Sequence, residues 1–270
     1  MKRSMLIPVA LMLVACTDAP VTGTTEASIR FDAVMTAVAT EAVLPSAYAS
    51  IMGETNNTFP HSVKNLRYQQ VFAGSDVVNP EIIGLCLRRD DVSGGGTSTT
   101  QTLAIKLGPT SLDYTNLGSN FASNYSGTPT EVFSGNVVVP AGTSGGITTD
   151  FDLCIPFSQT YNHPAGSNLI VEVVNTSLVS GNVPRDACSS TAATCTTTRA
   201  FAFSPTAENA ALVARGGLVM KFVSPEPPEP VEPPQPLTHE DCFKGGWTDF
   251  GFRNQGQCVR FVETGVDSRI

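Results

Sequence analysis

Cysteine is the residue type with the most evident chemistry in this chain. One of the seven cysteines, Cys16, lies near the N-terminus. The other six are Cys86, Cys154, Cys188, Cys195, Cys242 and Cys258. An even number of cysteines in an exported chain indicates disulfides, although spacing alone does not fix the connectivity. Short separations favour Cys188 with Cys195 and Cys242 with Cys258, which leaves Cys86 for Cys154. No pair has the C-x₂-C spacing of a zinc site, and we expect no metal and no cofactor.

A second group of residues has the order of a serine-protease triad. The run "GTSGG" at 142–146 is similar to the nucleophile loop of chymotrypsin-like proteases, and His61 and Asp113 precede Ser144 in that family's order. Thr143 stands where the family has Asp, however, and a triad is defined by geometry rather than by order. A Gly-rich hairpin turn explains the same run. We therefore expect no enzyme and no catalytic residues, and keep a serine hydrolase as a remote alternative.

Acidic and aromatic side chains provide two weaker candidate sites. The carboxylates are Asp90, Asp91, Asp150 and Asp152, and the aromatic group is Tyr114, Tyr125, Tyr161 and His163. The carboxylates lack EF-hand spacing, which favours solvated loop ends over a calcium site. The aromatic rings can stack on sugars, but tyrosines more often close the edge of a sandwich. Carbohydrate binding is therefore the alternative function.

The N-terminus has the features of an export signal. Two basic residues precede an apolar run at 5–15, which is too short to span a bilayer as a permanent helix. The run leads into "LVAC" at 13–16, which resembles the lipobox of bacterial lipoproteins. The resemblance implies cleavage after Ala15 and acylation of Cys16, with more than one acyl chain for stable anchoring. Thr17 after that cysteine implies the outer membrane in a Gram-negative cell.

Composition limits both the fold and the partners. The apolar fraction of 41% is enough for a core, and the charged fraction of 15% is low. Ser, Thr, Asn and Gly fill the difference, which is typical of an extracytoplasmic β-protein with many turns. A net charge of −8 opposes binding to nucleic acid, and no basic cluster offsets it. We therefore expect no nucleic-acid partner.

Short runs rich in β-branched and aromatic residues follow one another from about residue 63. They include "NLRYQQVF", "EIIGLCLRR", "QTLAIKL", "EVFSGNVVV", "ITTDFDLCIPF", "SNLIVEVVN", "RAFAFS" and "GLVMKFV". Gly, Pro, Asn and Ser separate them, which predicts an antiparallel β-sandwich of the jelly-roll or immunoglobulin-like kind over 59–223. Alternation puts Cys86 with Arg88 and Cys154 with Asp152 on the polar side of their strands. The bridge is therefore expected on the outer face, with Arg88 and Asp152 as a surface pair.

The composition changes at residue 224. Residues 224–237 are rich in proline and glutamate, which predicts an extended polyproline II spacer. The segment 238–270 is too short to bury a core unaided. Its two cysteines, glycines and aromatic residues predict a disulfide-closed β-hairpin with an aromatic mini-core. The candidate interaction residues are Trp247, Phe250 and Phe252 in this segment and Tyr161 in the sandwich.

Two segments resemble families of exported proteins. The run "CFKGGWTDFGFRNQGQCV" at 242–259 resembles a short motif that recurs at the C-termini of bacterial exported proteins. Residues of about 65–175, with "LRYQQVFAGSDVVNPEIIGLCLRRD" and "DFDLCIPFSQTYNHPAGSNLIVEVV", are more loosely similar to an uncharacterised β-domain of bacterial surface proteins. Neither resemblance brings catalytic residues, and both imply an envelope context.

Together these features predict a membrane-anchored lipoprotein of the cell envelope with a non-enzymatic interaction or structural role. Its expected parts are a signal peptide at 1–15, a lipidated tether of undecided structure at 16–58, a sandwich at 59–223, a linker at 224–237 and a mini-module at 238–270. The lipid attaches the protein to the membrane, and an envelope protein or a glycan is its expected partner.

Overall fold

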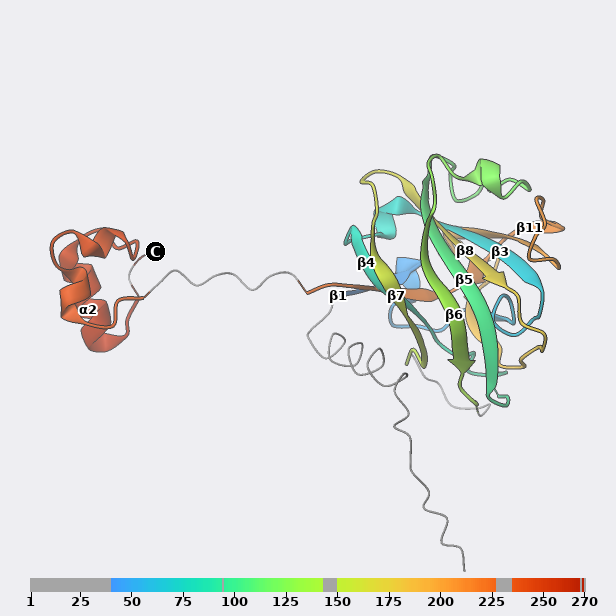
Figure 1. Ribbon diagram of the computed structural model, residues 1–270, viewed down its shortest axis with the longest axis horizontal. Coiled ribbons are helices and arrows are strands. Elements are labelled where there is room, and N and C mark those ends of the chain that lie inside the picture. The colour runs from blue at the N-terminus through green and yellow to red at the C-terminus, as the bar shows by residue number, and fades with distance from the viewer. Residues whose placement is uncertain (1–39, 94, 143–149, 227–234, 268, 270) are drawn as a thin grey trace, which may run out of the picture. The chain divides into compact units, whose positions relative to one another are not determined.

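The larger part of the protein is built from antiparallel strands. The computed structural model describes residues 40–93, 95–142, 150–226, 235–267 and 269. The chain divides into two compact units, Met1–Glu226 and Pro227–Ile270, shown in Figure 1. All neighbouring strands that pair in the first unit are antiparallel. The predicted all-β class is therefore confirmed.

Two sheets form the layers of the sandwich, and a small third sheet accompanies them. The four-stranded sheet has the order β1 (Thr40–Leu44), β13 (Met220–Ser224), β4 (Glu81–Leu87) and β7 (Leu153–Asn162). The six-stranded sheet has the order β11 (Leu212–Arg215), β10 (Thr197–Ala202), β3 (Leu66–Phe72), β8 (Asn168–Asn175), β5 (Thr99–Thr110) and β6 (Thr130–Val139). The third has the order β12 (Gly217–Leu218), β9 (Arg185–Cys188) and β2 (Thr55–Asn57).

The main core lies between the two large sheets. Alternate side chains of each strand point inward, and the inward apolar ones are almost fully buried. The four-stranded sheet supplies Leu85, Leu87, Leu153, Ile155, Met220 and Phe222, and the six-stranded sheet supplies Leu103, Ile105, Leu107, Leu169, Val171 and Val173. The rings of Phe72 and Phe222 meet edge to face with their centroids 5.8 Å apart. Removing this apolar surface from water, at roughly 25 cal/mol per Å², is the main force that holds the layers together.

The outer face of the six-stranded sheet is covered as well. The segment 111–129, which contains the 3₁₀ turn η3 (Ala122–Asn124), contributes Leu117 and Phe121 to a second apolar cluster with Val71 and Ile170 of the sheet. This sheet is therefore buried on both faces over much of its area, which explains why β8 reads as a nearly continuous apolar run.

The sandwich begins earlier in the chain than predicted, so the boundary at residue 59 is wrong. Residues 40–57 supply β1, β2 and the buried Tyr48 of the 3₁₀ turn η1 (Ser46–Tyr48). β1 pairs with β13 and β2 pairs with β9, which lie far along the chain. A local pattern does not reveal such pairings. Residues 1–39, with the signal peptide and Cys16, and residues 227–234 of the linker lie outside the described residues.

The second unit is helical, so the predicted β-hairpin is wrong. Its elements are the 3₁₀ turns η4 (His239–Cys242) and η5 (Gly246–Thr248) and the helix α2 (Gln255–Thr264). The Asn254 side chain caps α2 by accepting a hydrogen bond from Gln257 N at 2.9 Å, and Gly265 ends the helix at φ 70°. Cys258 and Phe261 are three residues apart and both join the apolar cluster of this unit. This spacing indicates a helix.

Three disulfides join the six cysteines in the favoured pairs. They are Cys86–Cys154, Cys188–Cys195 and Cys242–Cys258. The first joins neighbouring strands β4 and β7, the second closes a loop after β9, and the third connects η4 to α2. The remaining 3₁₀ turn, η2 (Gly74–Asp76), follows β3. Each unit therefore has its own covalent cross-links.

Candidate functional site

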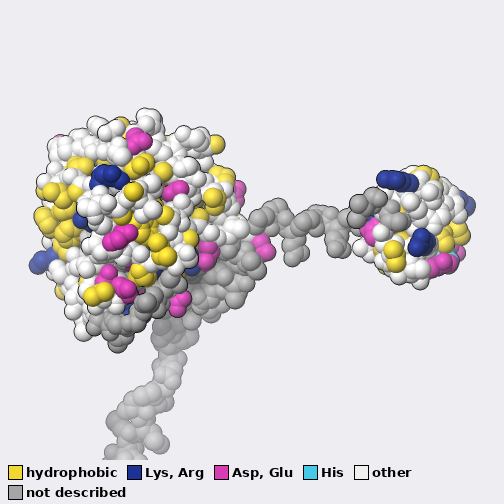
Figure 2. Space-filling view, turned by 180° about the vertical axis from the view of Figure 1, so that it is seen from behind, with side chains coloured by type: hydrophobic (Ala, Val, Ile, Leu, Met, Phe, Trp, Pro, Cys, Tyr) yellow, Lys and Arg dark blue, Asp and Glu magenta, His cyan; other side chains and the backbone are white. Residues whose placement is uncertain are grey.

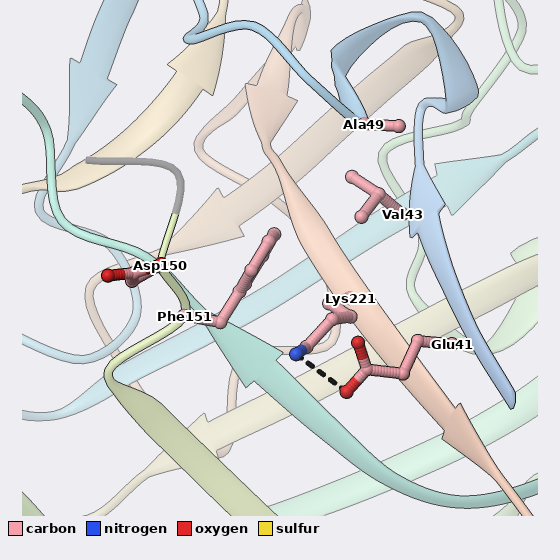
Figure 3. A pocket seen from close by; sticks show the side chains of 6 residues that line it. All are labelled: Glu41, Val43, Ala49, Asp150, Phe151 and Lys221. Carbon is pink, nitrogen blue, oxygen red and sulfur yellow. Dashed lines mark hydrogen bonds and ion pairs between the residues drawn. The ribbon is translucent and has the colours of Figure 1, made fainter. Parts of the chain in front are cut away.

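A surface pocket of about 410 Å³ lies on the four-stranded sheet. Its lining residues are Glu41, Val43, Ala49, Asp150, Phe151 and Lys221, which Figure 3 shows as sticks. Lys221 Nζ donates to Glu41 Oε1 at 2.7 Å and lies 5.1 Å from the centre of the Phe151 ring. None of the six lining side chains is a serine, cysteine or histidine. The charged side chains of the lining suit contact with a polar group.

The register of this sheet places a row of side chains across its outer face. Val43, Lys221, Cys86 and Cys154 are successive partners on β1, β13, β4 and β7. Directly opposed residues of neighbouring strands project to the same face, so the first disulfide lies beside Lys221 and next to the pocket. The predicted position of this bridge on the outer face is confirmed.

Cys154 also lines a groove between β6 and β7, the terminal strands of the two large sheets. The groove has a volume of about 230 Å³, and its other lining residues are Phe133, Asn136, Val137, Val138, Leu153, Ile155 and Pro156. Farther along β7, two side chains reach the backbone of β6. Ser158 Oγ donates to Val132 O at 3.0 Å, and Gln159 Nε2 donates to Glu131 O at 2.7 Å. Side chains of β7 therefore bond to the backbone of β6.

A buried ion pair lies at the end of β4. Arg88 Nε donates to Asp186 Oδ2 at 2.7 Å, and both side chains are 0% exposed. Arg88 also donates from Nη2 to the carbonyl oxygens of Tyr48 and Ile51. Burial raises the pKa of Asp186, and the hydrogen bond and charge of Arg88 act against that rise. This pair joins β4 to β9 inside the unit.

The predicted surface pair of Arg88 with Asp152 is therefore wrong. Asp152 instead binds Arg185 Nη1 at 2.6 Å and Arg89 Nε at 3.0 Å. Strand β4 ends at residue 87, and side-chain alternation beyond a strand end does not predict the partner of the next residue. The Arg88 side chain turns into the structure.

The residues of the serine-protease reading do not form a triad. His61 is 1% exposed, and burial lowers its pKa to about 3, with the charge of Arg185 acting in the same direction. Within the described residues neither ring nitrogen of His61 has a hydrogen-bond partner, so the ring does not bond to Asp113. Asp113 is exposed, and hydrogen bonds from Thr115 lower its pKa. Ser144 lies outside the described residues.

The aromatic residues considered for sugar stacking are largely enclosed. Tyr161 is 4% exposed and His163 is 6% exposed. The Tyr125 hydroxyl donates to Glu172 Oε2 at 3.3 Å. Phe203, at 62%, is the only exposed aromatic side chain in the described part of the sandwich. Figure 2 shows apolar side chains spread in small groups between charged ones on the face in view. An exposed row of aromatic rings is thus lacking among these residues.

Two of the four carboxylates considered for calcium, Asp90 and Asp152, are engaged locally. Asp90 Oδ1 accepts hydrogen bonds from the backbone N–H groups of Val92 and Ser93 at 3.2 and 2.6 Å. Asp152 forms ion pairs with Arg89 and Arg185. In the part of the chain that the structure describes, no group of three or more His, Cys, Asp or Glu side chains is placed to hold a metal ion.

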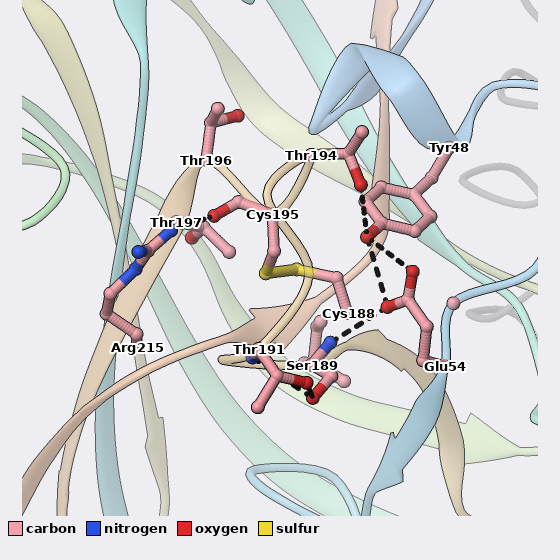
Figure 4. The surroundings of a disulfide bond; sticks show 12 residues. Tyr48, Glu54, Cys188, Ser189, Thr191, Thr194, Cys195, Thr196, Thr197 and Arg215 are labelled. Atoms are coloured by element: carbon pink, nitrogen blue, oxygen red, sulfur yellow. Dashed lines mark hydrogen bonds between the residues drawn. A yellow bond between two sulfur atoms is a disulfide. The ribbon is translucent and has the colours of Figure 1, made fainter.

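The Cys188–Cys195 loop is fixed by a small polar network, shown in Figure 4. The Tyr48 hydroxyl donates to Glu54 Oε1 at 2.9 Å and lies 3.0 Å from Thr194 Oγ1. Glu54 Oε2 in turn accepts from the backbone N–H of Ser189 at 3.0 Å. Both cysteines are at most 1% exposed. This bridge is therefore part of a packed core.

The second unit presents one aromatic turn to solvent. Phe243 is 45% exposed, and the next two residues, Lys244 and Gly245, have φ of 54° and 94°. Trp247 and Phe250 are half-buried against the Cys242–Cys258 bridge. The turn displays its ring because two successive left-handed residues reverse the chain directly after it.

The predicted interaction residues thus differ in accessibility. Trp247 and Phe250 keep part of their surface in solvent, whereas Phe252, at 3% exposed, and Tyr161 are core residues. The sequence interpretation missed Phe243. Its position between Cys242 and "KGG" is the signal that would have indicated an exposed turn.

No described helix has the length and apolar character needed to cross a membrane. Comparison with known proteins found no matching family model, no matching curated protein and no matching solved structure.

Proposed function

We propose that this chain is a lipid-anchored protein of the bacterial cell envelope that acts by binding rather than by catalysis. The pairing of its cysteines is the observation that supports this most strongly. Six cysteines form three intramolecular bridges, and such bridges are typical of oxidising compartments outside the cytosol. They leave Cys16, in "LVAC", as the cysteine outside the bridges. This division fits export followed by acylation of Cys16.

The second unit supports a binding role. A cross-linked unit that exposes Phe243 beside Lys244 has the amphipathic character of a contact surface. It follows a run rich in proline and glutamate, a composition that is typical of a linker. We propose that the turn around Phe243 contacts an envelope partner while the lipid retains the protein at the membrane, the outer membrane in a Gram-negative cell.

Metabolic labelling tests the anchor. Cells that express the wild-type chain or Cys16→Ser are fed an alkyne-tagged fatty acid, and the protein is purified and fractionated. Label and membrane association are expected for the wild type, and both should be lost in Cys16→Ser. Thr17→Ser, which leaves the acceptor intact, is the matched control. Label that persists in Cys16→Ser would contradict the proposal.

Site-specific cross-linking tests the contact. A photoreactive residue is placed at Phe243 or, as a control, at Glu263, which is also exposed but lies on α2. Adducts in intact cells should form from position 243 and be weak from position 263. Equal yields from both positions would show that the turn is not the contact. Adducts to polysaccharide rather than protein would favour the carbohydrate-binding alternative.

A further inference from the structure

Cys154 differs from the other bridged cysteines in its accessibility. The remaining five, Cys86, Cys188, Cys195, Cys242 and Cys258, are each at most 1% exposed. Cys154 is partly exposed and lines the groove between β6 and β7. Thiol–disulfide exchange requires that a thiolate reach one sulfur of the bridge. Of the three bridges, the one between β4 and β7 is therefore the one that presents a cysteine to an attacking thiol.

The sulfur on the other side of this bridge is placed next to a cation. Lys221 is the register partner of Cys86 on the neighbouring strand β13, and the Cβ atoms of such partners are about 5 Å apart. The Lys221 side chain is only 16% exposed, and its ammonium group packs over the Phe151 ring. A nearby ammonium group stabilises a thiolate, and a stabilised thiolate leaves faster in exchange.

A second cation lies on the same side of the sheet. The Arg88 guanidinium is centred 5.2 Å from the Phe151 ring, so Lys221 and Arg88 both contact this ring. Arg88 is already committed to Asp186. Lys221 is paired with Glu41, whose side chain is 46% exposed, so water screens that pair.

We propose that Cys86–Cys154 is a site of thiol–disulfide exchange with a dithiol reductant of the envelope. In the first step a thiolate of the dithiol attacks Cys154 Sγ, the S–S bond breaks, and its electron pair leaves on Cys86 Sγ beside Lys221. In the second step the other thiolate of the reductant attacks the reductant sulfur of the mixed disulfide. The bond from that sulfur to Cys154 breaks, and its electron pair leaves on Cys154 Sγ. The reductant is oxidised to a disulfide by two electrons, and each freed cysteine takes a proton from water.

The fold tolerates this reaction without losing β7. The ladder between β4 and β7 pairs residues on both sides of the bridge, from Glu81 with Asn162 to Leu87 with Leu153. Core side chains such as Leu153 and Ile155 hold the strand against the other sheet. The reduced form is therefore expected to stay folded, so the exchange is reversible.

Differential alkylation of the full-length protein in detergent tests the order of reduction. The native protein is treated with increasing dithiothreitol, quenched with N-ethylmaleimide and mapped by peptide mass spectrometry. Cys188–Cys195 is the internal reference, because it belongs to the same unit and is buried. Cys86 and Cys154 are expected to be reduced at least tenfold faster than this pair. Reduction of Cys188–Cys195 first, or of both pairs together, would overturn the proposal.

A monothiol identifies the attacked sulfur. Limited treatment with reduced glutathione should place the mixed disulfide on Cys154, with Cys86 free. An adduct found mainly on Cys86 would refute the stated direction of attack.

Lys221 variants test the leaving group. Lys221→Met should slow reduction of Cys86–Cys154 several-fold relative to the reference pair, and Lys221→Arg should restore most of the rate. Lys64→Met, at an exposed lysine in the turn before β3, is the matched control and should leave the rate unchanged. A purely structural role of Lys221 would alter both bridges alike. An unchanged ratio in Lys221→Met would count against the proposal.

Discussion

At the level of single residues, the buried charges of the sandwich depend strongly on their partners. Arg88 and Asp186 are both fully buried, and Asp186 also accepts a hydrogen bond from Gly53 N at 2.8 Å. By contrast, the Lys221–Glu41 pair is partly exposed, with Glu41 at 46%. Water screens the second pair but not the first, so the two should respond very differently to loss of one charge.

Asp186→Asn tests this difference. The substitution keeps the shape of the side chain but leaves the Arg88 charge buried without its counter-ion, and should lower the free energy of unfolding by about 3–5 kcal/mol. Urea denaturation followed by circular dichroism measures the change. Glu41→Gln is the control and should cost less than about 1 kcal/mol. Similar losses in both variants would contradict the assigned roles.

His61 should make stability depend on pH. Burial holds its pKa at about 3, below the value near 6.5 of an unfolded imidazole. Between these values the unfolded chain binds a proton that the folded chain excludes, so stability falls as the pH falls. From pH 7 to pH 5 this group should cost about 2 kcal/mol of the free energy of unfolding.

Urea titrations at the two pH values provide the measurement. His61→Gln should lose this part of the pH dependence, whereas His239→Gln, at an exposed histidine of the second unit, should retain it. An unchanged pH dependence in His61→Gln would show that the buried imidazole is not responsible.

At the level of elements, α2 depends on its ends more than a long helix would. It is a 10-residue helix, and isolated helices of this length are marginal in water. Asn254 caps it, and Arg253 N donates back to Gln257 Oε1 at 3.2 Å. The Cys242–Cys258 bridge then connects the helix to η4. The cap and the bridge together allow so short an element to persist.

Asn254→Ala should lower the stability of the second unit by about 1 kcal/mol, because the backbone N–H of Gln257 loses its hydrogen-bond acceptor at the helix start. Trp247 is the only tryptophan of the chain, so its fluorescence during urea denaturation reports on this unit alone. Gln255→Ala, at the next position, should have a small effect. The assigned cap would be contradicted if the substitution destabilised the sandwich and left the unfolding transition seen by Trp247 fluorescence unchanged.

At the level of the whole molecule, each of the two units has its own apolar cluster and cross-link. The sandwich contains the main core and two disulfides, and the second unit packs Phe252, Trp247 and Phe261 around the third. Units with separate cores are expected to unfold separately.

Truncation after Glu226 tests this independence. The main calorimetric transition of the sandwich should stay within about 2 °C of its value in the full chain, since a shift of that size corresponds to about 0.5–1 kcal/mol for a domain of this size. The tryptophan signal should disappear with the second unit. Loss of the main transition on truncation would show that the two units fold as one.

Several features of this protein follow from local sequence. Alternating apolar residues in β5 and β7 indicate strands because alternate side chains of a strand share a face. Short spacing pairs Cys188 with Cys195 and Cys242 with Cys258. The proline-rich run at 224–237 predicts a linker, and the division between the two compact units, after Glu226, lies within that run. These inferences need only neighbouring residues, and the structure confirms the strands and the cysteine pairs.

Other features depended on contacts between distant segments. The membership of β1 and β2 in the sheets, the burial of His61 and the pairing of Arg88 with Asp186 are set by residues more than 90 positions away in the chain. The exposure of Cys154 likewise depends on the other sheet, because the groove that Cys154 lines lies beside β6, the terminal strand of that sheet. Sequence pattern indicated the longer strands between β3 and β13 and favoured the cysteine pairs that the structure contains. The tertiary structure alone decided register and burial, because these arise from the packing of two sheets whose strands are not neighbours in the chain.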